Sequence, residues 1–303
     1  YERDSAAYYL ELRTELDPEN VEWIMEAAKY ICVYLGDYNK ALEFFNKALT
    51  ISENIVGTEH PDTANTYYSL GICYYELGNY DKALEYYNMA LAIRERVLGF
   101  DHPDTATSYN VIGVYFEKLG DYEKALEYYN KALEIREKVL GTEHPDTATT
   151  YDNIGVCYTS LGDYDKALVY LNKALKIREK VLGTEHPTTA TSYNNIGWCY
   201  DNLGDYDKAL VYHNKALEIR EEVLGTEHPS TALSYNNIGV CYYSLGDYDK
   251  ALEYYNKALK IYEKVLGAEH PSTALSYNNI GACYDNLGDY DKALVYHNKA
   301  LEI

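Results

Sequence analysis

The feature that most constrains this chain is a short phrase that returns at a fixed interval. VLGTEHP stands at residues 139–145, 181–187 and 223–229, and near copies stand at 55–61, 97–103 and 265–271, so every step is 42 residues. A period of this length is typical of repeat proteins, whose units stack along one axis and bury their apolar faces against one another. The 303 residues are therefore predicted to form one array rather than two globular domains.

One repeat contains two helix patterns. From Pro145 to Leu161 the apolar residues recur three and four positions apart, which predicts a helix that begins at the proline. Gly162 suits the end of that helix, and Asp163 suits the N-cap of a second helix that ends at Gly183. We therefore expect each repeat to hold a helix A, a tight turn, a longer helix B and the loop GTEH. Stacked antiparallel pairs of this kind form an all-α solenoid.

The repeat resembles a known family. Tyr-x-x-Ile-Gly-x-x-Tyr, Gly-Asp-Tyr-x-x-Ala and a further alanine are similar to the tetratricopeptide repeat; in one repeat these positions are Tyr193, Ile196, Gly197, Tyr200, Gly204, Tyr206, Ala209 and Ala216. The usual form has about 34 residues. This 42-residue form, with IREKVLGTEHP after helix B, resembles the repeats of kinesin light chains and nephrocystin-like proteins over about residues 56–303. The resemblance implies a right-handed superhelical solenoid whose concave groove, lined by the A helices, binds extended peptide segments.

The repeat boundaries follow from these patterns. We expect full repeats at 57–98, 99–140, 141–182, 183–224 and 225–266, a divergent repeat before them at 18–56, and a repeat at 267–303 that stops within helix B. Residues 1–17 are expected to hold helix B of a partial preceding repeat. Both ends look like cuts from a longer array, or like the ends of an engineered repeat protein. Uncapped ends of this kind could associate head to tail.

The resemblance places in the groove the two residues that precede the Ile-Gly pair of each repeat. From the 99–140 repeat onward these are Asn110 and Val111, Asp152 and Asn153, Asn194 and Asn195, Asn236 and Asn237, and Asn278 and Asn279. An asparagine amide both donates and accepts hydrogen bonds, so a row of amides can hold the backbone of an extended peptide. The same residues can instead solvate the surface or link neighbouring repeats.

The groove positions that follow the glycine differ between repeats. Trp198 stands where other repeats have small aliphatic residues, and it is either an anchor for a ligand or a packing variant. Tyr243 is a further aromatic candidate in the groove. Acidic residues outnumber Lys118 at these positions, which favours a basic or apolar peptide over an acidic one; they are Glu76, Glu117, Asp152, Asp201 and Asp285.

Charge and cysteine content limit the partners and the compartment. The formal net charge is −21 and no basic run occurs, so neither nucleic acid nor an anionic membrane is an expected partner. No apolar run approaches the roughly 20 residues of a membrane helix. Cys199, Cys241 and Cys283 recur one repeat apart. We expect them to be small buried side chains in a reducing compartment, which favours the cytoplasm.

No catalytic or metal-binding motif is evident, and no cofactor is expected. Six histidines occur once per repeat in the HP step, too far apart to converge on one ion, and are expected to cap helices or pack loops. His213 and His297 replace Tyr or Leu within helix B and are expected to be packing residues. The 37 tyrosines are explained by packing between helices.

Together these features predict a non-enzymatic protein-interaction scaffold whose groove binds an extended peptide. The candidate groove residues are Asn110, Asp152, Asn153, Asn194, Asn195, Trp198, Asp201, Asn236, Asn237, Tyr243, Asn278, Asn279 and Asp285. The alternative is an architectural role, in which the array is a spacer or sensor arm that stacks end to end. An enzyme would need a clustered acid–base site, which the sequence does not show.

Overall fold

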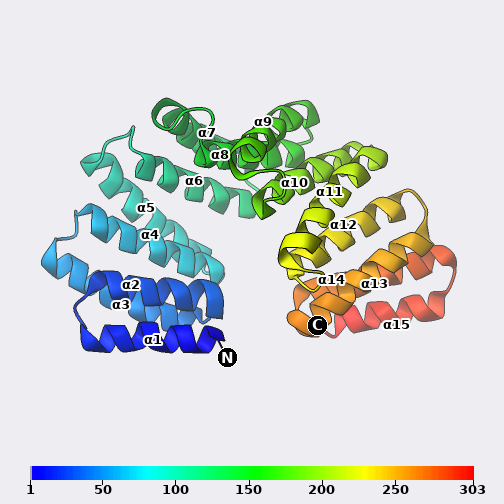
Figure 1. Ribbon diagram of the computed structural model, residues 1–303, viewed down its shortest axis with the longest axis horizontal. Coiled ribbons are helices and arrows are strands. Elements are labelled where there is room, and N and C mark those ends of the chain that lie inside the picture. The colour runs from blue at the N-terminus through cyan, green and yellow to red at the C-terminus, as the bar shows by residue number, and fades with distance from the viewer. Residues whose placement is uncertain (1) are drawn as a thin grey trace. The chain divides into compact units, whose positions relative to one another are not determined.

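Helices account for the whole architecture. The structure is a computed structural model that describes residues 2–303. Within this range it contains 15 α-helices, one short π-helical segment and no strand (Figure 1). The predicted all-α fold class is therefore confirmed.

The chain divides into two compact parts, residues 1–142 and residues 143–303. The first, here called the N-terminal part, contains α1 (Glu2–Leu16), α2 (Val21–Tyr30), the π segment Ile31–Leu35, α3 (Tyr38–Ile55), α4 (Pro61–Glu76), α5 (Tyr80–Val97), α6 (Pro103–Lys118) and α7 (Tyr122–Val139). The second, the C-terminal part, contains α8 (Pro145–Ser160), α9 (Tyr164–Leu182), α10 (Pro187–Leu203), α11 (Tyr206–Leu224), α12 (Pro229–Ser244), α13 (Tyr248–Val265), α14 (Pro271–Leu287) and α15 (Tyr290–Leu301).

Within each part, consecutive helices pack as a stack of pairs. Each A helix packs against the B helix that follows it, as α10 does against α11, and each B helix packs against the next A helix, as α11 does against α12. This is the arrangement of an α-solenoid, in which a repeat contacts only its neighbours in the sequence.

The ends of the helices follow from local residues. His144 has an extended backbone before Pro145, and its Nδ1 accepts a hydrogen bond from the Asp146 N–H at 3.1 Å. Asp163 caps α9 by accepting from the Lys166 N–H at 3.2 Å. The histidine-proline steps are therefore helix N-caps, as the sequence analysis expected, and their side chains satisfy N–H groups that would otherwise lack partners.

Glycine and aromatic residues control how closely the two helices of a pair approach. A Cβ atom added to Gly239 on α12 would lie 2.7 Å from Cδ1 of Tyr255 on α13, so only glycine fits beneath that ring. Stacked tyrosine pairs recur at the same place in successive repeats, for example Tyr242 and Tyr254 with ring centroids 5.6 Å apart. These contacts confirm that tyrosines pack between helices, where the rings bury large apolar areas.

The divergent repeat at the start contains the π segment. Phe45 and Tyr87 are equivalent core residues 42 positions apart, whereas the buried Cys32 and Cys73 are 41 apart, so this repeat is one residue shorter between its cysteine and its B-helix core residue. The π segment Ile31–Leu35 follows α2 directly, and its Ile31 and Cys32 are buried in the same core cluster as Phe45. All six cysteines are buried and free, as expected for small apolar side chains.

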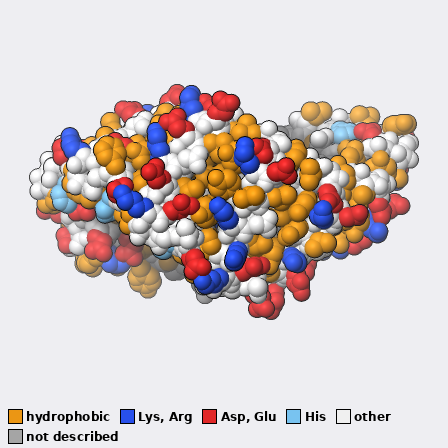
Figure 2. All heavy atoms as spheres, turned by 90° about the horizontal axis from the view of Figure 1, so that it is seen from above, with side chains coloured by type: hydrophobic (Ala, Val, Ile, Leu, Met, Phe, Trp, Pro, Cys, Tyr) orange, Lys and Arg blue, Asp and Glu red, His pale blue; other side chains and the backbone are white. Residues whose placement is uncertain are grey.

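The surface mixes charge types. Figure 2 shows lysine and acidic side chains interspersed with apolar ones over the face that it displays. Within residues 2–303, no helix combines the length and the apolar character that crossing a bilayer requires.

Candidate functional site

The candidate asparagines lie on the A helices and bond from one repeat to the next. In the C-terminal part, the second residue of each pair donates its side-chain N–H to the first residue of the preceding pair. The bonds run from Asn195 to Asp152 (2.9 Å), from Asn237 to Asn194 (2.8 Å) and from Asn279 to Asn236 (3.0 Å). We call these six residues the amide ladder; it extends from α8 to α14.

The sequence left open whether these asparagines hold a ligand, solvate the surface or link neighbouring repeats. The bonds of the ladder show that they link neighbouring repeats. The second residue of each bonded pair nevertheless keeps side-chain groups that can form further hydrogen bonds. Asn195, Asn237 and Asn279 are partly buried. Each amide has a second N–H and a carbonyl oxygen besides the bond just described. Because that bond orients the amide, its other groups are held in position in advance of any ligand.

The first members of the pairs differ in their accessibility. Asp152 and Asn236 are buried, Asn194 is partly buried and Asn278 is exposed. Outside the ladder, Asn110 on α6 and Asn153 on α8 are partly buried, and Asn110 Oδ1 lies 3.4 Å from Arg136 Nη1. Asn278 is therefore exposed, Asp152 and Asn236 are buried, and the other members of the predicted row are partly buried.

Asp152 is the one acidic member of the ladder, and its charge is turned toward the core. Its carboxylate lies 3.3 Å from Nη1 of Arg178 on α9, and both side chains are buried. Burial raises the pKa of Asp152, while Arg178 and the bond from Asn195 oppose that shift. Asp152 Oδ1 has no hydrogen-bond partner. The charge of Asp152 therefore faces Arg178 between α8 and α9, where both side chains are buried.

A row of buried arginines was not expected from the sequence. Arg94, Arg136, Arg178 and Arg220 recur every 42 residues in helix B, and each is at most 5% exposed. Arg220 on α11 donates from Nη1 to the Ser230 backbone oxygen (3.1 Å) and to Ser234 Oγ (2.7 Å) on α12. The signal that could have revealed them is the phrase Ile-Arg-Glu, in which a cation recurs on the apolar stripe of the helix.

The two aromatic candidates are partly buried and lie on successive A helices of the C-terminal part. Trp198 is on α10, where its backbone oxygen accepts a hydrogen bond from the Asn202 side chain at 2.8 Å. Tyr243 on α12 packs edge-on against Tyr248, with ring centroids 5.5 Å apart, and its hydroxyl accepts from Asn286 Nδ2 at 2.9 Å. Tyr243 is therefore fixed by its neighbours, and both rings retain accessible surface.

Asp201 contacts two buried side chains from neighbouring helices. Its Oδ2 lies 2.8 Å from Nε2 of His213 on α11, and its Oδ1 lies 2.9 Å from Sγ of Cys241 on α12. His213 is fully buried beneath Gly197, where an added Cβ would lie 2.7 Å from the ring. Burial and the contact with Asp201 raise the pKa of the Cys241 thiol.

These three residues form a group of metal-ligand types that the sequence analysis did not bring together. Their ligand atoms all lie within 4.8 Å of one another. From the sequence, Asp201 was expected in the groove, His213 was expected to be a packing residue, and Cys241 was expected to be a small buried side chain. A signal was present, because in the 183–224 repeat and in the 267–303 repeat an aspartate occurs 12 residues before a histidine. Only the fold shows that Cys241 meets that pair.

Asp285 and His297 repeat the acid–imidazole contact in a more open setting. His297 Nε2 lies 3.0 Å from Asp285 Oδ2, and its Nδ1 lies 2.8 Å from Oδ1 of Asn278. Asp285 is exposed and His297 is partly buried. Asp285 therefore keeps more access to solvent than Asp201 does.

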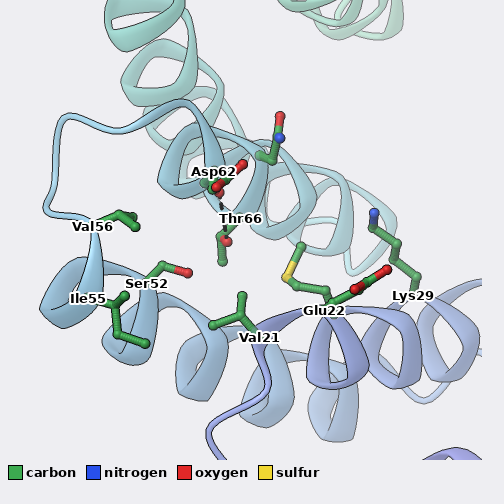
Figure 3. A pocket seen from close by; sticks show the side chains of 10 residues that line it. Val21, Glu22, Lys29, Ser52, Ile55, Val56, Asp62 and Thr66 are labelled. Atoms are coloured by element: carbon green, nitrogen blue, oxygen red, sulfur yellow. Dashed lines mark hydrogen bonds between the residues drawn. The ribbon is translucent and has the colours of Figure 1, made fainter.

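Two of the cavities in the N-terminal part are lined by residues of α2 and α4. One, of about 500 Å³, lies among α2, α3 and α4, and Figure 3 shows Val21, Glu22 and Lys29 of α2 facing Ser52 and Ile55 of α3 and Asp62 and Thr66 of α4. The second, of about 440 Å³, is lined by Tyr68, Ser69 and Ile72, which are groove positions by the family pattern, and by Lys29 and Arg94. Lys29 was missed because the divergent repeat lacks the Ile-Gly pair that marks groove positions in the others.

Three solved structures share much of this arrangement of helices. BtubC (BKLC) from P. vanneervenii is 27% identical with a TM-score of 0.59, over 74% of this chain and 88% of that one. A kinesin light chain-like protein from Podosopora anserina with nearly identical TPR-like repeats is 24% identical with a TM-score of 0.56, over 66% and 95%. The STAND protein from Pyrococcus horikoshii with a tetratricopeptide repeat sensor is 22% identical with a TM-score of 0.68, over 96% and 43%.

No curated protein matches the chain. A profile of the tetratricopeptide repeat matches residues 23–96, 75–138, 104–180, 159–222, 202–264 and 230–303. These matches overlap and together cover residues 23–303. The chain therefore belongs to the tetratricopeptide repeat family.

Proposed function

We propose that the chain is a non-catalytic protein-interaction module that binds an extended segment of a partner along the A helices of its C-terminal part. The observation that supports this most directly is the amide ladder. It holds three partly buried amides, those of Asn195, Asn237 and Asn279, at one position in three successive repeats.

The spacing of the ladder suits an extended chain. Packed helices lie about 8–10 Å apart, and an extended peptide advances about 3.3 Å per residue. One ladder amide therefore meets every third residue or so of a bound segment. An amide that both donates and accepts can bond to a peptide group at each meeting, whatever the side chain there. This arrangement recognises backbone, and the residues around it supply selectivity.

The surrounding residues favour a basic or apolar segment. Trp198 and Tyr243 offer aromatic surface on adjacent A helices, and aromatic residues often carry much of the binding energy at interfaces. Asp285 is exposed, and the net charge of −21 attracts cationic partners over longer range. Asp152 and Asp201 contribute less to this preference than the sequence alone suggested, because Arg178 and His213 lie against them.

A selection of random peptides on the purified chain tests the proposal. The informative variant is N195A/N237A/N279A. The matched control is N172A/N214A/N256A, which removes amides from the same number of repeats but from exposed positions of the B helices. Those control amides bond only to a backbone oxygen one turn earlier in their own helix, at 2.6–2.7 Å.

We expect enrichment of basic or apolar sequences on the unmodified chain and on the control, and loss of that enrichment on the ladder variant. Enrichment of acidic sequences would overturn the charge preference and leave the ladder proposal standing. Equal enrichment on the ladder variant and the control would place the binding surface elsewhere, with the cavity at Tyr68 and Lys29 as the next site to test.

A second candidate function is head-to-tail association between copies. On α15, Leu301 and Leu294 are 82% and 61% exposed, whereas Leu217 and Leu259, which match Leu301 in earlier repeats, are buried. The α15 face thus has the apolar composition that a following helix covers elsewhere in the array. Sedimentation velocity over a range of concentrations tests this candidate. A mass that rises with concentration in the unmodified chain, and stays at that of the monomer in L294K, would support head-to-tail association. A constant monomer mass in the unmodified chain would contradict it.

A further inference from the structure

Asp201, His213 and Cys241 come from three consecutive helices and meet at one buried point. His213 Nε2 and Cys241 Sγ both approach the Asp201 carboxylate, at 2.8 and 2.9 Å, and the three ligand atoms lie within 4.8 Å of one another. His213 and Cys241 are fully buried and Asp201 is partly buried. One nitrogen, one sulfur and one oxygen donor therefore surround a common point inside the C-terminal part.

The hydrogen bonds among Asp201, His213 and Cys241 leave one buried polar atom of the three residues without a partner. For both contacts to be hydrogen bonds to an ionised Asp201, the Cys241 thiol and the His213 Nε2–H must donate, which leaves Nδ1 of His213 as a bare acceptor in the neutral ring and as a bare donor in the protonated ring. That atom is buried and has no partner. A buried polar atom without a partner costs free energy, so the protein-only arrangement is incomplete at a residue with no exposure to water.

A metal ion on Nε2 changes the tautomer of His213 and moves the ring proton to Nδ1. In the 267–303 repeat, Nδ1 of the equivalent His297 lies 2.8 Å from Oδ1 of Asn278. The residue that matches Asn278 in the 183–224 repeat is Asn194, whose oxygen accepts from Asn237. A carbonyl oxygen can accept two hydrogen bonds, so we assign Asn194 Oδ1 as the acceptor to which the Nδ1–H of the metal-bound tautomer would turn. Metal-ligating histidines commonly donate their other N–H in this way.

The donor set selects the kind of ion. A thiolate and an imidazole suit zinc, whereas calcium and magnesium take oxygen ligands. Zinc bonds of about 2.0–2.3 Å in a tetrahedron separate the ligand atoms by roughly 3.3–3.8 Å. The contacts of 2.8 and 2.9 Å therefore need to open by less than about 1 Å, which side-chain rotation can provide.

Within residues 2–303 the full set of three occurs once, although Asp285 and His297 repeat its aspartate and histidine two repeats later. The preceding repeat has Thr159, Leu171 and Cys199 at the matching positions, and the following repeat has Tyr243, Tyr255 and Cys283. Both share the cysteine and lack the aspartate and the histidine. Packing between repeats is thus achieved without this group, which argues that its residue types serve another purpose.

We propose that Asp201, His213 and Cys241 bind one Zn²⁺ ion, with the fourth position taken by water or by an atom of a ligand. The ion joins α10, α11 and α12 and so ties two successive repeats together. Its binding energy then contributes to the folding of the C-terminal part. This proposal stands independently of the peptide-binding function.

The test begins with metal-free protein prepared by dialysis against a chelator. Zinc chloride is titrated in competition with a chromophoric chelator, and cobalt chloride is titrated separately to read the geometry from the visible spectrum. We expect one high-affinity ion per chain, d–d bands of the intensity that marks a tetrahedral site, and a thiolate-to-cobalt charge-transfer band. Zinc should also raise the Tm of the metal-free protein.

The chain supplies its own matched variant. D201T/H213L installs the residues of the preceding repeat, Thr159 and Leu171, next to an unchanged Cys241, so it is expected to fold. Its zinc affinity should fall at least about 100-fold, since even the loss of residues that only orient metal ligands commonly costs 10–100-fold. C241A should remove the charge-transfer band as well as the tight binding.

A second control addresses the exposed histidines of the HP steps. His228 and His270 cap α12 and α14, and asparagine is also a good N-cap. H228N/H270N should therefore keep both the fold and the tight zinc site. The proposal is overturned if the unmodified chain binds no zinc with a thiolate signature, or if D201T/H213L binds zinc as tightly as the unmodified chain.

Discussion

Asn237 and Asn194 lie 43 residues apart in the sequence, and a side-chain hydrogen bond of 2.8 Å joins them. The same 43-residue offset joins Asn195 to Asp152 and Asn279 to Asn236. The offset exceeds the repeat period by one because the second residue of each pair reaches the first residue of the preceding pair. A ladder asparagine therefore serves the contact between repeats as well as the surface to which we assign the ligand.

Removing one rung should weaken the stack by the value of one hydrogen bond. We expect N237A to lower the free energy of unfolding by about 1 kcal/mol, because it leaves the partly buried Asn194 oxygen without its donor. N214A is the control, since its exposed amide bonds only to Leu210 of its own helix. Urea unfolding followed by circular dichroism measures both. Equal effects of the two variants would show that the bond between repeats adds nothing to stability.

The buried arginine row predicts a larger effect. R220A should lower the free energy of unfolding by about 2–4 kcal/mol, because it removes buried side-chain volume and the bonds from Arg220 to Ser230 and Ser234. R220Y should cost clearly less than R220A, because the next repeat carries Tyr262 at the same position and buries it. Thermal and urea unfolding of the two variants give the comparison. A tyrosine variant as unstable as the alanine variant would contradict this account of the position.

Gly197 is predicted to be intolerant of even one added methyl group. A Cβ there would lie 2.7 Å from Cε1 of His213. The ring is fully buried and has little room to move, so G197A should cost about 1–3 kcal/mol. In an H213A background the same change should cost much less, because the obstructing ring is absent. A double-mutant cycle measures the difference, and strict additivity would contradict the proposed contact.

Acid should destabilise the array through the caps of its B helices. Five of these caps are aspartates, each of which accepts hydrogen bonds from the side chain and the backbone N–H of the lysine three residues after it. These bonds lower the pKa of the aspartate below the ordinary 3.8; the aspartates are Asp121, Asp163, Asp205, Asp247 and Asp289. A pKa that is lower in the folded state stabilises it above the unfolded pKa, and this stabilisation is lost as the pH falls through the folded value.

The variant D205N isolates one cap from the rest. Asn79 already caps α5 by accepting from the Lys82 N–H, so the amide should keep the fold at neutral pH. The unfolding free energy of D205N should fall less steeply than that of the unmodified chain below about pH 4. Urea unfolding at a series of pH values measures both slopes. Identical slopes would show that Asp205 does not contribute to the acid dependence.

The helices were predictable because their ends depend on neighbouring residues. Pro145, Asp163 and Gly183 act within one turn of their own positions, and the structure begins and ends α8 and α9 within a residue or two of where the pattern predicts. The π segment Ile31–Leu35 was not anticipated, because nothing in its own residues distinguishes it.

The site was only partly predictable, because its contacts join residues about one repeat apart. The sequence indicated that asparagines line the A helices, but it could not show that Asn237 bonds to Asn194 or that Arg178 lies against the Asp152 carboxylate. Those partners depend on the register between stacked helices. The meeting of Cys241 with Asp201 and His213 is of the same kind, since three helices have to be placed before it appears.

The central claim is that the ladder amides hold the backbone of a partner segment. Its most direct test is the affinity of one selected peptide, measured by fluorescence anisotropy, for the unmodified chain, N195A/N237A/N279A and N172A/N214A/N256A. We predict that the ladder variant binds at least about tenfold more weakly, a loss of about 1.4 kcal/mol or more, while the control stays within about twofold. A ladder variant that folds and binds the peptide as tightly as the control would contradict the claim.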